Sequence, residues 1–116
     1  MKKLIIALLA TTSLAGCMDS PKQDLLENMI CAGLAHEIDK RDPAHSDEWE
    51  HQFILLSNAG QRIFEAHQID VKIMEQYIDK NWPVYLEDPD FIPKKHLVQY
   101  WTKHECEDRV TKHSGL

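Results

Sequence analysis

The spacing of apolar residues from position 20 onward limits the fold of this chain more than any other feature. Ser20-Pro21-Lys22-Gln23 has the form of a helix-capping box, with proline at the first helical position. The helix should end before Asp42-Pro43, because a residue that precedes proline resists the α conformation. Between these bounds an apolar residue recurs every four positions, at Leu26, Ile30, Leu34 and Ile38.

The same spacing predicts three further helices. The second starts either after Asp42-Pro43 or at Ser46, and its apolar positions are Trp49, Phe53, Leu56, Gly60, Ile63 and Phe64. The third is capped by Asp70 and carries Val71, Met74, Tyr77, Ile78 and Trp82. The last opens at Pro93 and carries Leu97, Val98, Trp101 and Val110.

The remaining segments favour turns over strands. Leu86–Ile92 is the longest non-helical candidate, and no long alternating run or Asn-Gly turn suggests a strand. Helices with short connections indicate an all-α fold, a small antiparallel bundle of about four helices.

The first sixteen residues follow a different pattern. Lys2-Lys3 precede the apolar run 4–10, and small residues follow it, which is the order of a secretory signal. A membrane-spanning helix is the alternative, but it needs about 20 apolar residues and this run is shorter. An ordinary cleaved signal with a chance cysteine is a second alternative.

Leu14-Ala15-Gly16-Cys17 makes the signal more specific. This motif resembles the lipobox of bacterial lipoprotein signal peptides, and the resemblance covers residues 1–17. It implies that the chain is cut before Cys17 and that Cys17 is lipidated and anchors the protein to a membrane. In enteric bacteria, Asp directly after the lipidated cysteine retains a lipoprotein in the inner membrane. Because Met18 holds that place here, the outer membrane is favoured, with the domain facing the periplasm.

These features predict a division of the chain into three parts. Residues 1–16 are the cleaved signal, 17–20 a short lipidated tether, and 21–116 a single helical domain. Loss of Lys2 and Lys3 lowers the basic residues from 13 to 11 against 19 acidic ones, a formal charge of −8. Such a body is a poor candidate for nucleic acid, which binds basic patches, and its charge suits a basic partner.

Two cysteines remain after lipidation, Cys31 and Cys106. An even number in an oxidising compartment predicts a disulfide, which would join the first helix to the last. Those two helices are neighbours in an antiparallel bundle, so the pairing and the architecture agree. Two free thiols or thiolate metal ligands are the alternatives.

Catalytic and metal-binding patterns are weak. The mature chain has seven histidines, but no pair is spaced three or four apart, so we expect neither a metal site nor a cofactor. Protonation of all seven would nearly cancel the charge, which leaves a pH-sensing role open. The chain has no Gly-x-Ser-x-Gly motif and no phosphate-binding loop, and we expect neither catalytic residues nor a small-molecule substrate.

The aromatic residues suggest an interface instead. Several crowd the turn before the last helix, and Tyr85 and Phe91 lie there beside Glu87, Asp88 and Asp90. Exposed aromatics anchor protein interfaces, although core packing is the alternative. We therefore expect these five residues to bind a protein partner.

Two classes of function fit these features. One is a small helical protein-binding module, similar in general form to immunity proteins, inhibitors and secretion accessories of the bacterial envelope. The other is a structural or acid-stress lipoprotein, including chaperones that respond to low pH. Both likenesses are to a type of protein and rest on size, compartment and cysteine count.

Overall fold

Five α-helices make up most of residues 20–114, the part of the chain that the computed structural model describes. They are α2 (Pro21–Arg41), α3 (Ser46–Ala66), α4 (Val71–Asn81), α5 (Lys94–Lys103) and α6 (Cys106–His113). Three 3₁₀ turns lie between them, η2 (Pro43–His45), η3 (Val84–Leu86) and η4 (Pro89–Phe91). Residues 20–114 contain no strand, so the all-α prediction is confirmed.

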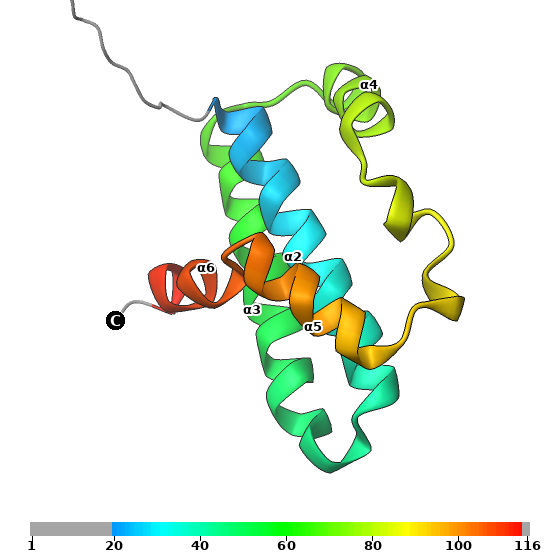
Figure 1. Cartoon of the computed structure of the whole chain (residues 1–116). Coiled ribbons are helices and arrows are strands. Elements are labelled where there is room, and N and C mark those ends of the chain that lie inside the picture. The colour runs from blue at the N-terminus through cyan, green and yellow to red at the C-terminus, as the bar shows by residue number, and fades with distance from the viewer. Residues whose placement is uncertain (1–19, 115–116) are drawn as a thin grey trace, which may run out of the picture.

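Helices α2 and α3 form an antiparallel hairpin that runs the length of the molecule (Figure 1). Ser20 caps α2, since its hydroxyl accepts a hydrogen bond from the Gln23 amide at 3.2 Å, as the capping pattern predicts. Of the two predicted starts for α3, Ser46 is correct. Gly60 permits a close crossing, because a Cβ there would lie 3.3 Å from Leu25 Cδ1.

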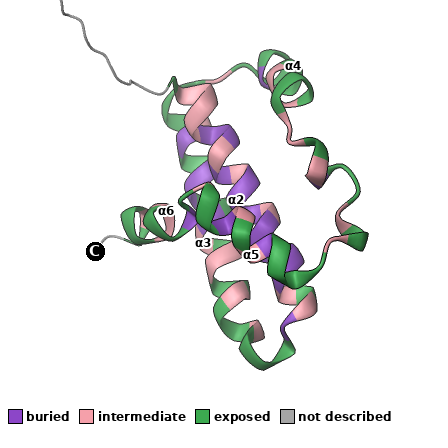
Figure 2. Ribbon diagram, viewed as in Figure 1, coloured by how far each residue is buried: buried purple, intermediate pink, exposed green. Residues whose placement is uncertain are grey.

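Helix α2 is the centre of the bundle, and ten of its 21 residues are buried on several sides (Figure 2). Its neighbours cover it from different directions: α3 along its length, α5 across it, and α4 and α6 on opposite sides of the hairpin (Figure 1). The core is apolar and includes the fully buried Ile30, Leu34, Ile38, Leu56 and Leu97.

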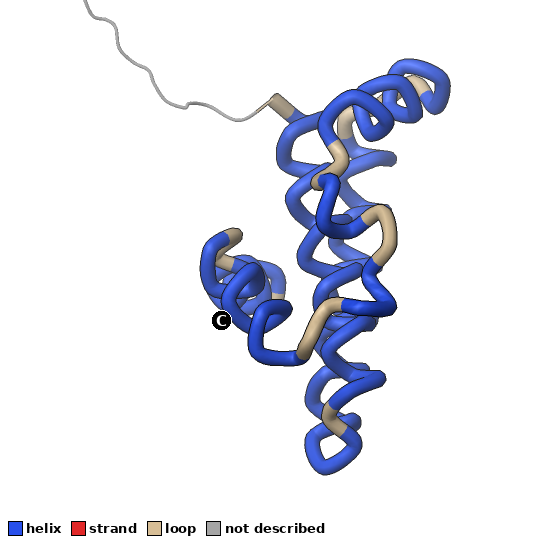
Figure 3. The backbone as a smooth tube through the Cα atoms, turned by 45° about the vertical axis from the view of Figure 1, so that its right-hand side comes forward, coloured by secondary structure: helices blue, strands red, loops and turns tan. Residues whose placement is uncertain are grey.

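The last predicted helix is divided in two. The chain turns at His104-Glu105, where Glu105 has a left-handed φ of 55°, and α6 departs in a new direction (Figure 3). The prediction of one helix through Val110 was therefore wrong. The reason is geometric: with about 100° per residue, a straight helix would place Cys106 roughly 140° around from Trp101, away from the core.

The turn allows Cys106 to reach Cys31. The two cysteines form a disulfide with a Cα–Cα distance of 5.5 Å, and both are fully buried. The predicted pairing is confirmed, and it joins α2 to α6, the first and last described helices. The fold is a small helical bundle, with five described helices where about four were expected.

Cys17 and the tether 17–20, apart from Ser20, lie outside the described residues. Within 20–114, no helix combines the length and apolar character needed to cross a membrane.

Candidate functional site

The loop between α4 and α5, residues 82–93, is held against the end of α2 by Arg41. The Arg41 guanidinium donates from Nη2 to the carbonyl oxygen of Pro89 at 2.7 Å and from Nε to that of Ile92 at 2.9 Å. Arg41 also donates to the Glu37 carboxylate at 3.1 Å. Burial raises the pKa of Glu37, but ion pairs with Arg41 and Lys40 outweigh it and leave that pKa below its usual value. The carboxylate therefore stays charged and holds Arg41 in place.

Tyr85 supports the same loop from its other end. Its ring stacks on Tyr100 of α5 with centroids 3.8 Å apart, and its hydroxyl hydrogen-bonds His104 Nε2. His104 Nδ1 lies 3.2 Å from the Glu27 carboxylate on α2. Burial, followed by the fields of Tyr100 and Glu27, raises the pKa of Tyr85, so its hydroxyl stays protonated and available as a donor.

Two large apolar side chains of this loop remain exposed. Phe91 is 86% exposed and Val84 is 78% exposed, the highest values among the exposed large apolar side chains of residues 20–114. Both line a shallow hollow of about 470 Å³, together with Tyr85, Glu87, Asp88, Ile92, Pro93, His96 and Tyr100. We refer to Val84, Glu87, Asp88 and Phe91 as the loop surface.

The structure brings together four of the five residues that the sequence singled out. Tyr85, Glu87, Asp88 and Phe91 line the hollow, whereas Asp90 is exposed on the same loop but does not line it. Tyr85 is half-buried and packs inward, so Phe91 presents the free ring.

Sequence reasoning missed Val84 and Arg41. Val84 follows Pro83 directly, and a lone valine at such a position carries no signal of exposure. Arg41 is separated from Pro89 by 48 positions, and no local pattern connects them.

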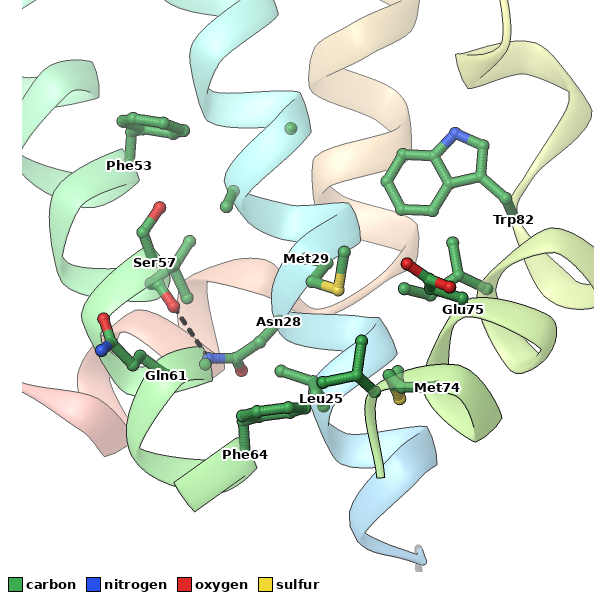
Figure 4. Close-up of a pocket in the computed structure, with 16 residues that line it drawn as sticks. Leu25, Asn28, Met29, Phe53, Ser57, Gln61, Phe64, Met74, Glu75 and Trp82 are labelled. Atoms are coloured by element: carbon green, nitrogen blue, oxygen red, sulfur yellow. Dashed lines mark hydrogen bonds between the residues drawn. The ribbon is translucent and has the colours of Figure 1, made fainter. Parts of the chain in front are cut away.

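A second, larger hollow lies between the α2–α3 hairpin and α4. Its volume is about 560 Å³. We refer to it as the apolar pocket; in Figure 4, Phe53 and Phe64 approach it from α3, Met29 from α2 and Trp82 from beyond α4. The rest of its lining comprises Leu25, Asn28, Ala32, Gly33, Leu56, Ser57, Gly60, Gln61, Val71, Met74, Glu75 and Ile78.

Asn28 is the fully buried polar residue of this lining. Its side-chain amide donates to the carbonyl oxygen of Leu56 at 3.1 Å, as Figure 4 shows, and its oxygen accepts from Arg109 Nη1 at 2.5 Å. Arg109 also donates to the Asp24 carboxylate at 2.7 Å. These bonds connect α2 to both α3 and α6.

Asp42 connects three elements at the other end of the hairpin. Its carboxylate lies 3.0 Å from His45 Nδ1 and 3.1 Å from Lys94 Nζ, and it accepts from Trp49 Nε1 at 3.2 Å. The hydrogen bond from His45, helped by those from Lys94 and Trp49, lowers the pKa of Asp42 to about 2 despite some desolvation. This carboxylate joins the start of α5 to the α2–α3 turn.

Among residues 20–114, no group of three or more His, Cys, Asp and Glu side chains has a geometry that could hold a metal ion. The charged and polar side chains described above bind one another across helices. Comparison of the chain with protein-family models, curated proteins and solved structures found no match.

Proposed function

We propose that this protein is a lipid-anchored module of the bacterial envelope that binds a protein partner through the loop surface. The observation that carries the proposal is the exposure of Phe91 and Val84 on a loop that Arg41 and Tyr85 hold in place. An apolar side chain exposed on a fixed backbone loses little conformational freedom on binding, so more of its burial energy becomes affinity.

The energetic role of each residue type differs. Full burial of a Phe or Val side chain is worth about 1.5–3 kcal/mol, which suits Phe91 and Val84 as anchors. Glu87 and Asp88 beside them would steer a basic partner, and charges at a rim change association rate more than affinity. The formal charge of −8 on the chain after the signal supports a basic partner too.

Lipidation at Cys17 sets the location in this proposal. The lipobox-like motif supports anchorage, with the outer membrane favoured because Met18 follows the cysteine. Stable anchorage needs more than one acyl chain, since a single chain binds reversibly. The intact mass of the mature protein tests this step: the wild type should carry acyl mass and Cys17→Ser should not. A wild-type protein without acyl mass would remove the anchor and the location.

Partner capture tests the binding step. Full-length tagged protein is crosslinked in cells and recovered, and stoichiometric partners are identified by mass spectrometry. We expect Val84→Ser with Phe91→Ala to weaken binding about 25-fold or more, which corresponds to about 2 kcal/mol at an interface hot spot. Helical circular dichroism and melting temperature should stay unchanged, because both side chains are exposed.

Ile54→Ser is the matched control, since Ile54 is 48% exposed on α3, outside the loop. It should bind as the wild type does. Equal capture by the loop-surface variant and the wild type would place the interface elsewhere. Tyr85→Ala is a poorer test of the loop surface, because it also removes the stack of Tyr85 on Tyr100.

A further inference from the structure

The apolar pocket has the properties of a ligand site that is separate from the loop surface. A volume of about 560 Å³ falls within the roughly 300–1,000 Å³ that is typical of small-molecule sites. Its polar residue in the interior, Asn28, has both ends of its amide bonded to Leu56 and Arg109. The lining therefore offers no free buried amide to a polar ligand, and what enters the pocket should be apolar.

Size distinguishes between the apolar occupants. An α-helix is about 10–12 Å across and rises 5.4 Å per turn, so one turn fills roughly 420–610 Å³. The volume of the pocket matches about one turn, so a longer helix of a partner protein or of a second copy would lie mostly outside it. An alkyl chain is much narrower, and the flexible side chains of Met29 and Met74 can adapt to its shape.

One charge lies on the lining. Among the pocket residues Glu75 is the single ionisable side chain, it is exposed, and in Figure 4 it extends from α4 on the side where Trp82 lies. A carboxylate at this position attracts a positively charged head group and repels the carboxylate of a fatty acid. Trp82 beside it adds a ring that favours cations.

We propose that the apolar pocket binds the alkyl chain of a single-chain amphiphile whose positively charged head group lies at Glu75. Helix α4 forms the outer wall of this site. Its described polar contact with the hairpin is one hydrogen bond, from the Tyr77 hydroxyl to Gln23 Oε1 at 2.5 Å, beside Lys22 over the Tyr77 ring. Such a wall can adjust to chains of different length.

Photolabelling of the full-length protein in cells tests this site. Two probes share one diazirine-bearing hexadecyl chain, and one ends in trimethylammonium while the other ends in carboxylate. After irradiation the tagged protein is purified and digested, and labelled residues are mapped by mass spectrometry. Labelling is normalised to total labelling of the cell envelope by each probe. We expect the ammonium probe to label α2 around Met29–Gly33 and α4 with Trp82.

Charge reversal makes the test specific to the head group. In Glu75→Lys, labelling by the ammonium probe should fall and labelling by the carboxylate probe should rise. Each change should be roughly two- to fivefold, as expected for one exposed ion pair. Asp79→Lys is the matched control, because it makes the same charge change on α4 at an exposed residue outside the lining. It should keep the wild-type ratio.

Filling the pocket tests the alkyl site. Gly33 lies beneath Trp82, and a Cβ there would be 3.9 Å from Trp82 Cη2, so Gly33→Ala fits and should label normally. Gly33→Leu should lose most of the labelling.

Three results would overturn the proposal. They are undiminished labelling of Gly33→Leu, an unchanged probe ratio in Glu75→Lys, and labelling spread evenly over the helix surfaces. The variant Val84→Ser with Phe91→Ala should label as the wild type does, so this site and the loop surface can fail separately.

Discussion

Arg41, the last residue of α2, donates a 2.7 Å hydrogen bond to the backbone carbonyl of Pro89, 48 residues further along the chain. This contact converts a proline-containing loop into a fixed surface, because a guanidinium that binds two carbonyls leaves the loop few alternative paths. The side chain that holds the loop surface is thus on the central helix, while the residues that would contact a partner are exposed.

Arg41→Ala should therefore loosen the loop between α4 and α5 and destabilise the fold by about 1–3 kcal/mol, the usual effect of losing hydrogen bonds to a charged group. Hydrogen exchange of amides in residues 84–93 should accelerate more than exchange in α3. Lys40→Ala is the control, since Lys40 pairs with Glu37 but does not contact the loop. Unchanged exchange in the loop would show that Arg41 does not hold it.

Asn28 and Arg109 should be energetically coupled across the centre of the bundle. Asn28→Leu removes one hydrogen bond to the Leu56 carbonyl and one from the charged Arg109 guanidinium, which keeps its bond to Asp24, so it should lower the free energy of unfolding by about 1–3 kcal/mol. Arg109→Met should lower the free energy of unfolding less in the Asn28→Leu variant than in the wild type. Urea unfolding of both single variants and the double variant measures the coupling, and strictly additive free energies would contradict it.

Asp42 should make the stability of the fold depend on pH in the acidic range. Its folded pKa of about 2 is below its ordinary value of 3.8, so its charged form stabilises the fold above about pH 4. That contribution is lost as the pH falls from about 4 to 2. Asp42→Asn should melt below the wild type at pH 5, and the difference should vanish near pH 2.

Asp47→Asn is the control for Asp42, because Asp47 is exposed in the first turn of α3. Melting temperatures of Asp42→Asn, Asp47→Asn and the wild type, measured between pH 2 and 5, test this prediction. A difference between Asp42→Asn and the wild type that stays constant over this range would mean that the Asp42 charge is not the cause.

Removing the Cys31–Cys106 disulfide should be the most damaging of these changes. A bridge between residues 75 apart should contribute roughly 4 kcal/mol by restricting the unfolded chain. Paired alanine substitutions should lower the urea midpoint, and reduction of the wild type should lower it by a similar amount. Equal midpoints before and after complete reduction would contradict this role.

The local features of the fold could be predicted from the sequence. The periodic apolar residues and the caps at Ser20 and Asp70 determine where α2 and α4 begin, because helix formation depends on neighbours three or four residues away. The pairing of Cys31 with Cys106 followed from their number and the compartment that the signal implies. The sequence alone also showed that Tyr85, Phe91 and three acidic residues lie close together along the chain.

Tertiary packing alone decided the rest. The break at Glu105 occurs because Trp101 and Cys106 must both reach the core, a demand that no pattern within the last helix expresses. The support of the loop by Arg41 depends on a contact across 48 residues. The apolar pocket depends on the distance between α4 and the hairpin, whose side chains line it together. Such distances are set by side chains from several elements at once, and periodicity carries information only about one element at a time.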